Sequence, residues 1–214
     1  MKYNKESLLL YAVTDRAWIG KQTLIEQVKD SLDGGATFIQ LREKELDDGT
    51  FLDEARKMKS LCKEYNVPFV INDNIDIAIE CDADGVHVGQ SDMDALNVKK
   101  RLGKDKIIGV SAQTVEQAII AQNSGADYLG VGAVFSTLTK LDADTVSFET
   151  LKQICDAVSI PVIAIGGIYD YNILKLSKSG IVGIAVVSAI FAQDNIKQST
   201  ANLLELATKM VKAE

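Results

Sequence analysis

Residues 34–41 read GGATFIQL, and the same order of residue types returns as SGADYLGV at 124–131 and as SGIVGIAV at 179–186. Each copy places a glycine directly before a short apolar run. A helix that ends in a tight turn needs a residue with positive φ, which glycine adopts without a steric cost. The three copies therefore indicate a unit in which a turn and a strand follow a helix, used more than once.

Runs of this kind recur along the whole chain, and each is followed by a polar turn and a helical pattern. We predict eight strands: Leu8–Asp15, Phe38–Lys44, Pro68–Asp73, Gly85–Gly89, Ile107–Ala112, Tyr128–Val134, Pro161–Gly167 and Gly183–Ala189. Between them apolar residues return with the helical period, as in Phe148, Leu151 and Ile154. Strands that alternate with helices, without a linker, predict an α/β fold, a (β/α)8 TIM barrel in a single domain over residues 1–214. An open doubly wound sheet is the alternative, and it is less favoured because no GxGxxG motif follows the first strand.

The composition excludes several classes of protein. The chain is 47% hydrophobic and 25% charged, with a formal net charge of −7. An acidic chain without a basic run is not expected to bind nucleic acid. The longest apolar run, Ile181–Ala192, is too short to span a bilayer, and no cleavage-like pattern follows Leu8–Val13. The three scattered cysteines, Cys62, Cys81 and Cys155, fit buried thiols in a reducing compartment, so we expect a cytoplasmic protein.

The carboxyl ends of the predicted strands carry the candidate functional residues. Active sites of (β/α)8 barrels form at these ends, and here nearly every strand with an apolar body ends in polar residues or glycine. The candidates are Gln40, Arg42, Lys44, Asn72, Asp73, Asp92, Ser111, Thr137, Thr139, Lys140, Gly167, Val187 and Ser188. Because alternate side chains of a strand share a face, Gln40, Arg42 and Lys44 should face the barrel mouth, whereas Glu43 should lie on the outer face as a bystander.

Five of these side chains predict a metal-bound diphosphate. Asp73 and Asp92 follow adjacent strands and supply the hard oxygen donors that Mg²⁺ binds together with phosphate oxygens. Arg42, Lys44 and Lys140 supply the cations that a polyphosphate requires. A metal beside three cations indicates a diphosphate rather than a lone carboxylate.

A second anion site is predicted after the seventh and eighth strands. Gly166-Gly167 and Val187-Ser188 lie where barrels often bind a monophosphate through backbone N–H groups. The candidates also have structural interpretations: either aspartate would serve as a helix N-cap, the cations would pair with surface acids, and Ser111 and the two threonines would be turn or loop residues. His87, the only histidine, lies within a strand and is expected to be a hydrogen-bonded interior residue rather than an acid or base. Convergence at one end of one barrel favours the functional interpretation.

The strand ends resemble those of the thiamine-phosphate synthase (thiamine-phosphate pyrophosphorylase) family, in order and along essentially the whole chain. The stretches that carry the resemblance are YAVTD, QLREK, VIND, GVHVGQSD, IGVSAQT, DYLGVGAVFSTLTKLDAD, IPVIAIGGI and GIAVVSAI. QLREK and the TLTK loop are specific together, whereas AIGGI is shared with many phosphate-binding barrels.

The resemblance implies a transferase of thiamine biosynthesis with Mg²⁺ as its cofactor. The reaction would join (4-amino-2-methyl-5-pyrimidinyl)methyl diphosphate to 4-methyl-5-(2-phosphoethyl)thiazole, giving thiamine phosphate and pyrophosphate without a protein nucleophile. The residues implied to bind the pyrimidine diphosphate are Gln40, Arg42, Lys44, Asn72, Ser111 and Lys140, of which Arg42, Lys44, Ser111 and Lys140 are the catalytic set. The residues implied to bind Mg²⁺ are Asp73 and Asp92, and those implied to bind the thiazole phosphate are Thr137, Thr139, Gly167, Val187 and Ser188.

The chain departs from the family pattern at five positions. The family usually has proline where this chain has Ala133 and Ser136, histidine at Gln113, arginine at Asn74 and a second basic residue at Leu141. None of these changes removes a predicted diphosphate or metal contact. Two alternatives remain, a thiazole tautomerase-like isomerase and a non-catalytic phosphate-binding barrel. The first needs a proton-shuttling base, which the change at Gln113 disfavours, and neither has a use for a metal–diphosphate site.

Overall fold

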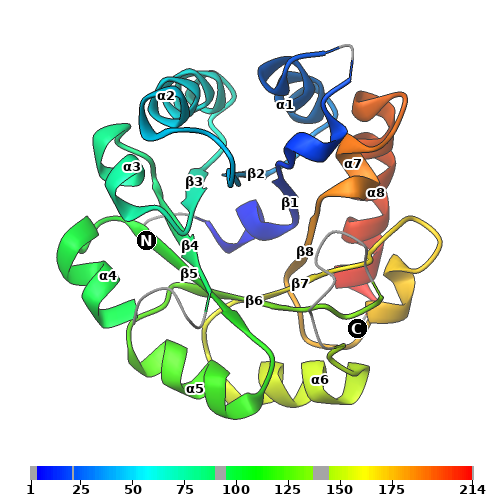
Figure 1. The fold of residues 1–214 in the computed structure, drawn as a ribbon. Coiled ribbons are helices and arrows are strands. Elements are labelled where there is room, and N and C mark those ends of the chain that lie inside the picture. The colour runs from blue at the N-terminus through cyan, green and yellow to red at the C-terminus, as the bar shows by residue number, and fades with distance from the viewer. Residues whose placement is uncertain (1–3, 21, 90–94, 137–144, 214) are drawn as a thin grey trace.

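The computed structural model describes residues 4–20, 22–89, 95–136 and 145–213. In these ranges the strands close into a barrel in chain order, and every neighbouring pair is parallel (Figure 1). The strands are β1 (Leu10–Val13), β2 (Phe38–Leu41), β3 (Phe69–Asn72), β4 (Gly85–Val88), β5 (Ile107–Ala112), β6 (Tyr128–Gly132), β7 (Val162–Ile165) and β8 (Gly183–Val186). Because β1 pairs with β8, the barrel prediction is confirmed and the open sheet is excluded.

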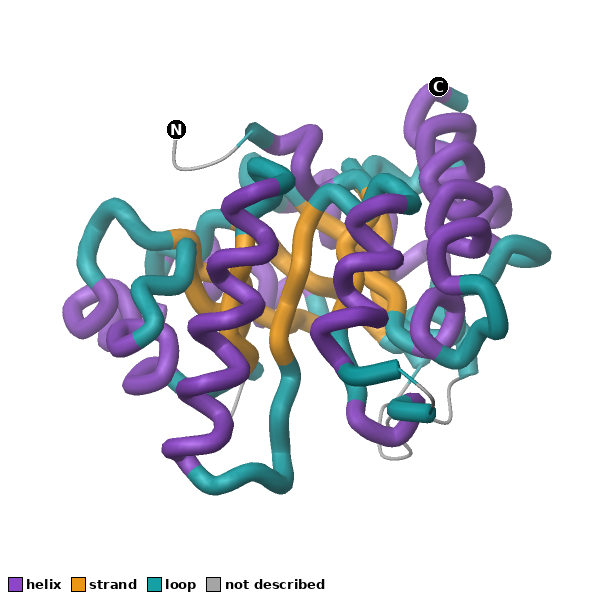
Figure 2. The backbone as a smooth tube through the Cα atoms, turned by 90° about the horizontal axis from the view of Figure 1, so that it is seen from above, coloured by secondary structure: helices purple, strands orange, loops and turns teal. Residues whose placement is uncertain are grey.

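Helices surround the barrel and stand beside its strands (Figures 1 and 2). The α-helices are α1 (Leu24–Asp33), α2 (Asp48–Glu64), α3 (Ile75–Glu80), α4 (Ala95–Leu102), α5 (Val115–Asn123), α6 (Phe148–Ala157), α7 (Ser188–Phe191) and α8 (Ile196–Lys212). Three 3-10 helices accompany them: η1 (Lys5–Leu8), η2 (Arg16–Trp18) and η3 (Ile173–Leu176). The connection from β7 to β8 contains η3 in place of an α-helix, so the seventh unit is shorter than a regular βα unit. Within the described ranges, none of the helices has both the length and the apolarity that crossing a bilayer requires.

Two apolar clusters hold the barrel together, one inside it and one between its strands and helices. β2 divides between them, with Phe38 inside the barrel and Ile39 and Leu41 in the outer cluster. Gln40 lies on the inner side as well, where it is 5% exposed and contacts Tyr11. The alternation predicted for this strand is therefore confirmed as far as Leu41.

The predicted glycine turns are also confirmed, since Gly35, Gly125 and Gly180 have φ values of 96°, 94° and 91°. One helix face was predicted wrongly. Phe148 is 43% exposed, because it occupies the first turn of α6, whose buried face begins further along at Leu151.

The boundary of β2 differs from the prediction in a way that affects the site. The strand ends at Leu41 and does not reach Lys44. Beyond Leu41, side-chain oxygens accept hydrogen bonds from the backbone N–H groups that would otherwise pair with a neighbouring strand. Thr14 Oγ1 accepts the N–H of Arg42 at 3.0 Å. Glu43 Oε1 accepts the N–H of Lys44 at 2.8 Å, which bends the chain into a loop. Arg42 and Lys44 are therefore loop residues, and strand alternation does not set their directions.

Candidate active site

The loop after β2 is joined to the loop after β1 by Arg42. Its Nη1 donates to Asp15 Oδ2 at 3.0 Å, in an ion pair that is partly buried. The other oxygen of Asp15 accepts the N–H of Ala17 at 2.9 Å and caps η2. The guanidinium is thus held at the barrel mouth by an acid that itself follows a strand end, and not by an acid on the outer surface.

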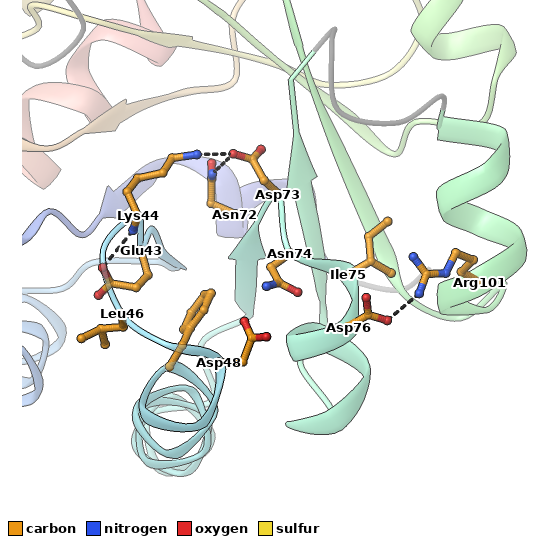
Figure 3. A pocket seen from close by; sticks show the side chains of 11 residues that line it. Glu43, Lys44, Leu46, Asp48, Asn72, Asp73, Asn74, Ile75, Asp76 and Arg101 are labelled. Atoms are coloured by element: carbon orange, nitrogen blue, oxygen red, sulfur yellow. Dashed lines mark hydrogen bonds and ion pairs between the residues drawn. The ribbon is translucent and has the colours of Figure 1, made fainter.

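Lys44 reaches across to the end of the next strand (Figure 3). Its Nζ donates to Asp73 Oδ2 at 2.7 Å, and the side chain of Asn72 donates to the same oxygen. The Lys44 and Asp73 side chains are 52% and 28% exposed, so an incoming ligand can reach both. Three residues predicted for the diphosphate and its metal therefore meet at one point.

Asp73 is held there by its backbone and is not the N-cap of α3. Its φ is 62°, in the left-handed region that residues other than glycine rarely occupy, and its N–H donates to the carbonyl of His87 at 2.9 Å. The N-cap is Asn74, whose side chain accepts the N–H of Ile77 at 3.0 Å. A non-glycine residue in this region costs about 1–3 kcal/mol, and such residues cluster at functional sites.

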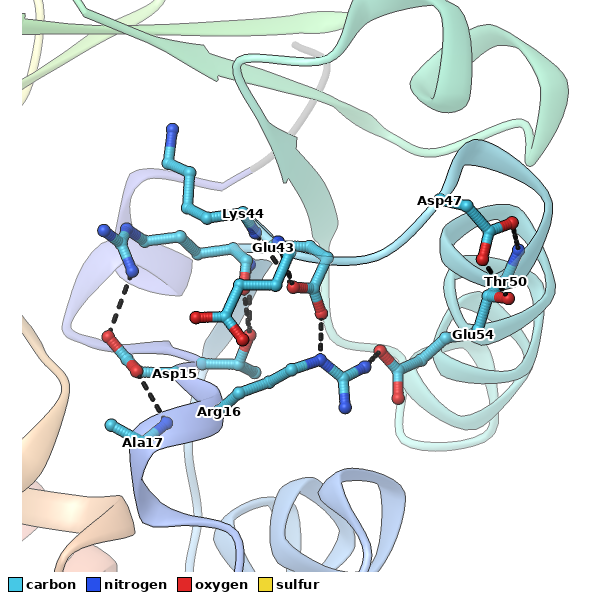
Figure 4. Close-up of polar contacts among 11 residues, drawn as sticks. Asp15, Arg16, Ala17, Glu43, Lys44, Asp47, Thr50 and Glu54 are labelled. Atoms are coloured by element: carbon cyan, nitrogen blue, oxygen red, sulfur yellow. Dashed lines mark hydrogen bonds and ion pairs between the residues drawn. The ribbon is translucent and has the colours of Figure 1, made fainter.

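Glu43 is not a bystander on the outer face, and that prediction was wrong. Its side chain is 2% exposed, and its Oε1 accepts the N–H groups of Lys44 at 2.8 Å and Glu45 at 3.1 Å. Its Oε2 accepts from Arg16, whose guanidinium also bonds Glu54 on α2 (Figure 4). Burial acts to raise the pKa of Glu43, but the N–H of Glu45, the Arg16 guanidinium and the N–H of Lys44 together lower it below its ordinary value.

The barrel interior connects two further candidates. Gln40 Nε2 donates to Tyr11 Oη at 2.6 Å, and Tyr11 Oη lies 2.9 Å from Tyr128 Oη. His87 contacts Tyr128 Oη through Nδ1 and Ser111 Oγ through Nε2, both at 3.0 Å. His87 is thus a hydrogen-bonded interior residue, as predicted. Burial, opposed by the charge of Asp73, lowers its pKa from 6.5 to about 4.

The candidates for the second anion site lie at the ends of β7 and β8. Gly166 and Gly167 have φ values of 96° and 65°, and a Cβ at Gly167 would overlap the backbone oxygens of Phe135 and Ser136. Ser188 opens α7 directly after Val187. Tyr169, on the loop after β7, lies with its Oη 2.7 Å from Ser188 Oγ and so joins the two strand ends.

Asp92, Thr137, Thr139 and Lys140 lie outside the described residues, as does Leu141. The other departures from the family pattern take part in local structure. Gln113 Nε2 donates to the carbonyl of Gly132 at 3.3 Å, and Asn74 caps α3. Ala133 is buried, whereas Ser136 is exposed. Among the described residues, no group of three or more His, Cys, Asp or Glu is arranged to hold a metal.

A cavity of about 480 Å³ opens beside the Lys44–Asp73 pair, between the loops after β2 and β3 and Arg101 of α4 (Figure 3). A smaller cavity of about 190 Å³ lies over the loops after β1 and β2, lined in part by Asp15, Arg16 and Arg42. Sequence reasoning omitted Asp15 and Arg16 from the candidates. The available signal was their place at the end of the first predicted strand, where Asp15 is the last residue of the quoted YAVTD stretch and Arg16 follows it.

Comparison with known proteins gives consistent results over nearly the whole chain. The family model described as "Thiamine monophosphate synthase" matches residues 10–190. The thiamine-phosphate synthase of Ruminiclostridium cellulolyticum is 53% identical over 203 residues, which cover 95% of this chain and 97% of that protein. The thiamine-phosphate synthase of Clostridium acetobutylicum is 46% identical over 200 residues, covering 94% and 95%.

A solved structure agrees with these matches in both sequence and fold. The thiamine phosphate pyrophosphorylase from Pyrococcus furiosus is 36% identical to this chain and superposes with a TM-score of 0.89. The match covers 97% of this chain and 98% of that one.

Proposed function

Since the chain belongs to the thiamine monophosphate synthase family and is a transferase of thiamine biosynthesis that acts on small molecules, we propose that it joins two specific substrates. They are (4-amino-2-methyl-5-pyrimidinyl)methyl diphosphate and 4-methyl-5-(2-phosphoethyl)thiazole, and the products are thiamine phosphate and pyrophosphate. The observation that carries this proposal is the Lys44–Asp73 pair, 2.7 Å apart at the ends of adjacent strands. The pair brings together the ammonium group of Lys44, which suits a diphosphate, and the carboxylate of Asp73, which suits the Mg²⁺ that accompanies a diphosphate.

The reaction is leaving-group chemistry in this proposal. The C–O bond between the pyrimidine methylene and the diphosphate breaks, and pyrophosphate leaves with the electron pair. The aminopyrimidine ring delocalises the positive charge, and the thiazole nitrogen then donates its lone pair to the methylene carbon. Arg42, Lys44 and Lys140 stabilise the charge that grows on the departing oxygens. Gln40, Asn72 and Ser111 orient the pyrimidine diphosphate, which lowers the entropic part of the barrier.

The donor set at the mouth fits Mg²⁺. Asp73 is an accessible carboxylate whose Oδ2 already attracts Lys44 and Asn72, so the position favours positive charge. Asp73 and Asp92 would hold the ion together with diphosphate oxygens, as Mg²⁺ sites commonly do. When bound, Mg²⁺ supplies neutralisation of charge on the pyrophosphate.

The thiazole phosphate would bind on the opposite part of the mouth. Gly167, Val187 and Ser188 offer backbone N–H groups and a hydroxyl, and Thr137 and Thr139 complete the proposed site. The positive φ of Gly167 supports a tight turn at this strand end, where a Cβ would overlap the loop backbone at Phe135 and Ser136 and only glycine is accommodated.

The direct test mixes the purified protein with both substrates and Mg²⁺ and follows thiamine phosphate by mass spectrometry. We expect product that depends on each substrate and disappears with EDTA. Omitting the pyrimidine diphosphate and following thiazole isomerisation tests the tautomerase alternative in the same preparation. Isomerisation without thiamine phosphate formation would refute the proposed function.

We further propose that residues 1–214 act as one barrel domain in the cytoplasm, without a nucleic-acid partner. Three thiols without a disulfide, at Cys62, Cys81 and Cys155, support a reducing compartment. Expression with a fluorescent tag and fractionation of the cells would test the location.

A further inference from the structure

Tyr169, on the loop after β7, contacts the residue that follows the end of β8. Its Oη lies 2.7 Å from Ser188 Oγ, and either hydroxyl can be the donor. Within the described part of the chain, no other group bonds the Ser188 hydroxyl. Tyr169 also lies two positions after Gly167 in the chain. The phenol therefore bonds one residue of the proposed thiazole-phosphate site and belongs to the same loop as another.

The backbone at Tyr169 is fixed by the buried side chain of Asn172, which is 6% exposed. Asn172 Oδ1 accepts the N–H of Tyr169 at 2.8 Å, and Asn172 Nδ2 donates to the carbonyl of Gly167 at 2.8 Å. The backbone N–H of Asn172 donates to the carbonyl of Tyr169 at 3.1 Å. One side chain thus sets the position of Tyr169 relative to the turn at Gly167.

The ring of Tyr169 is held as well. It stacks on the ring of Tyr171, with the centroids 5.5 Å apart and the planes 7° from parallel. This separation is within the range that stacked aromatic pairs favour. The Tyr169 side chain also packs against the outer apolar cluster. Because both the backbone and the ring are fixed, the phenol oxygen has a defined position at the start of α7.

We propose that Tyr169 is a positioning residue for the thiazole phosphate, which holds the Ser188 hydroxyl in the rotamer from which it donates to the phosphate. A hydroxyl that donates its proton to a phosphate oxygen still accepts a hydrogen bond at its own oxygen. The phenol of Tyr169 lies at the distance from which it can donate there. This role rests on the proposed function, because it takes the phosphate of the thiazole substrate to be the ligand of Ser188.

Positioning of this kind raises affinity because it is complete before the ligand arrives. An untethered serine side chain divides among three staggered rotamers, of which one suits the phosphate. Retaining that rotamer alone strengthens binding by about threefold. The hydrogen bond from the phenol also polarises the hydroxyl and makes it a stronger donor. We expect a combined effect of about fivefold, below the roughly tenfold contribution of a complete hydrogen bond.

A double-mutant cycle followed by calorimetry tests whether Tyr169 acts through Ser188. Tyr169→Phe removes only the phenol oxygen and keeps the ring that stacks on Tyr171. It should weaken binding of 4-methyl-5-(2-phosphoethyl)thiazole by about fivefold. Binding of the pyrimidine diphosphate should be unchanged, because the residues proposed for it lie on other strand ends. In a Ser188→Ala background, Tyr169→Phe should change thiazole-phosphate affinity by less than about twofold, because residues that act through one another are non-additive.

Tyr65→Phe is the matched control. It removes a phenol oxygen that donates to Asp33 Oδ1 at 2.6 Å. Tyr65 directly follows α2, which runs from the barrel mouth to the opposite end of the barrel. We therefore expect both ligand affinities to be unchanged in this variant. Thermal unfolding of every variant shows whether a loss of affinity comes from a loss of folded protein.

A crystal structure of the Tyr169→Phe variant tests the positioning without ligand or activity. We expect the Ser188 side chain to occupy more than one rotamer, and a single unchanged rotamer would overturn the proposal. An equal loss of affinity from Tyr169→Phe in both backgrounds would also overturn it, since an effect on the loop alone is additive.

The Ser188→Ala variant separates this proposal from the proposed function. Unchanged thiazole-phosphate binding by Ser188→Ala would refute the proposed thiazole-phosphate site, and the role of Tyr169 with it. Weaker binding by Ser188→Ala together with unchanged binding by Tyr169→Phe would overturn the role of Tyr169 alone.

Discussion

Replacing Glu43 by alanine should loosen the loop that carries Arg42 and Lys44. The carboxylate is the point at which this loop is fastened, because it accepts two consecutive backbone N–H groups and the guanidinium of Arg16. At 2% exposure of the Glu43 side chain, water does not already occupy these positions. Alanine would leave all three donors without that acceptor.

The magnitude follows from these contacts. A hydrogen bond to a charged group contributes roughly 1.5–3 kcal/mol, and the two backbone bonds together give about 3 kcal/mol at the lower limit. The Arg16 side chain is 27% exposed and keeps its ion pair with Glu54 in the variant, so loss of the Arg16–Glu43 bond adds less to the destabilisation. We therefore expect Glu43→Ala to lower the free energy of unfolding by about 3 kcal/mol. Glu54→Ala, which removes only an ion pair, should cost at most about 1 kcal/mol and serves as the matched control.

The assay combines urea unfolding with steady-state kinetics. Glu43→Ala should raise the KM for the pyrimidine diphosphate and leave that for the thiazole phosphate unchanged, because only the loop after β2 is altered. Equal destabilisation by Glu43→Ala and Glu54→Ala would refute the reasoning, since it would mean that the backbone bonds contribute nothing.

The pH dependence of unfolding gives an independent measurement at the same residue. Burial alone would raise the pKa of Glu43, but the N–H of Glu45, Arg16 and the N–H of Lys44 lower it below 4.5 in the folded protein. A carboxyl with a lowered folded pKa adds stability that is fully present above the unfolded pKa and is lost as pH falls through the folded one. The difference in stability between the wild type and Glu43→Gln should therefore be largest above pH 4.5 and shrink in acid.

Three further substitutions test separate parts of the site. Lys44→Ala should weaken binding of the pyrimidine diphosphate by about 1.5–3 kcal/mol in calorimetry, and an unchanged affinity would reject its assigned role. Asp92→Ala should abolish Mg²⁺-dependent pyrophosphate release while sparing thiazole-phosphate binding, and full turnover would reject the metal assignment. Gly109→Ala should destabilise the barrel by about 1–3 kcal/mol in urea unfolding through overpacking against the ring of Tyr128, which a Cβ there would overlap. Gly20→Ala, which meets nothing within 4 Å, is its control, and equal effects of the two would contradict the packing argument.

The sequence alone determined the parts of the structure that depend on local geometry. Strand alternation is set by the backbone of the strand itself, so the sequence correctly placed Gln40 on the side of β2 that faces away from the outer cluster. The glycine turns were found because a positive φ is a property of single residues, as at Gly35 and Gly125. Repetition of these local signals was sufficient to predict the closed barrel.

Only the tertiary structure decided how the loops at the barrel mouth are held. Glu43 was predicted to lie outside because strand alternation was extended past Leu41, where the strand had already ended. Its partner Arg16 lies 27 residues away along the chain, and Arg16 in turn bonds Glu54 at a separation of 38 residues. No periodic signal reports such contacts, because they form only when the barrel closes and brings separate loops together.

The hydrogen bonds of His87 inside the barrel also show which features the sequence determines and which depend on the tertiary structure. The sequence indicated that His87 is buried and hydrogen-bonded, since it lies within a strand between valines. It did not indicate that Tyr128 and Ser111 are its partners, because these residues lie 41 and 24 positions away. The direction of a strand's side chain is a local property, whereas the group it meets inside a closed barrel depends on the register of every strand between them.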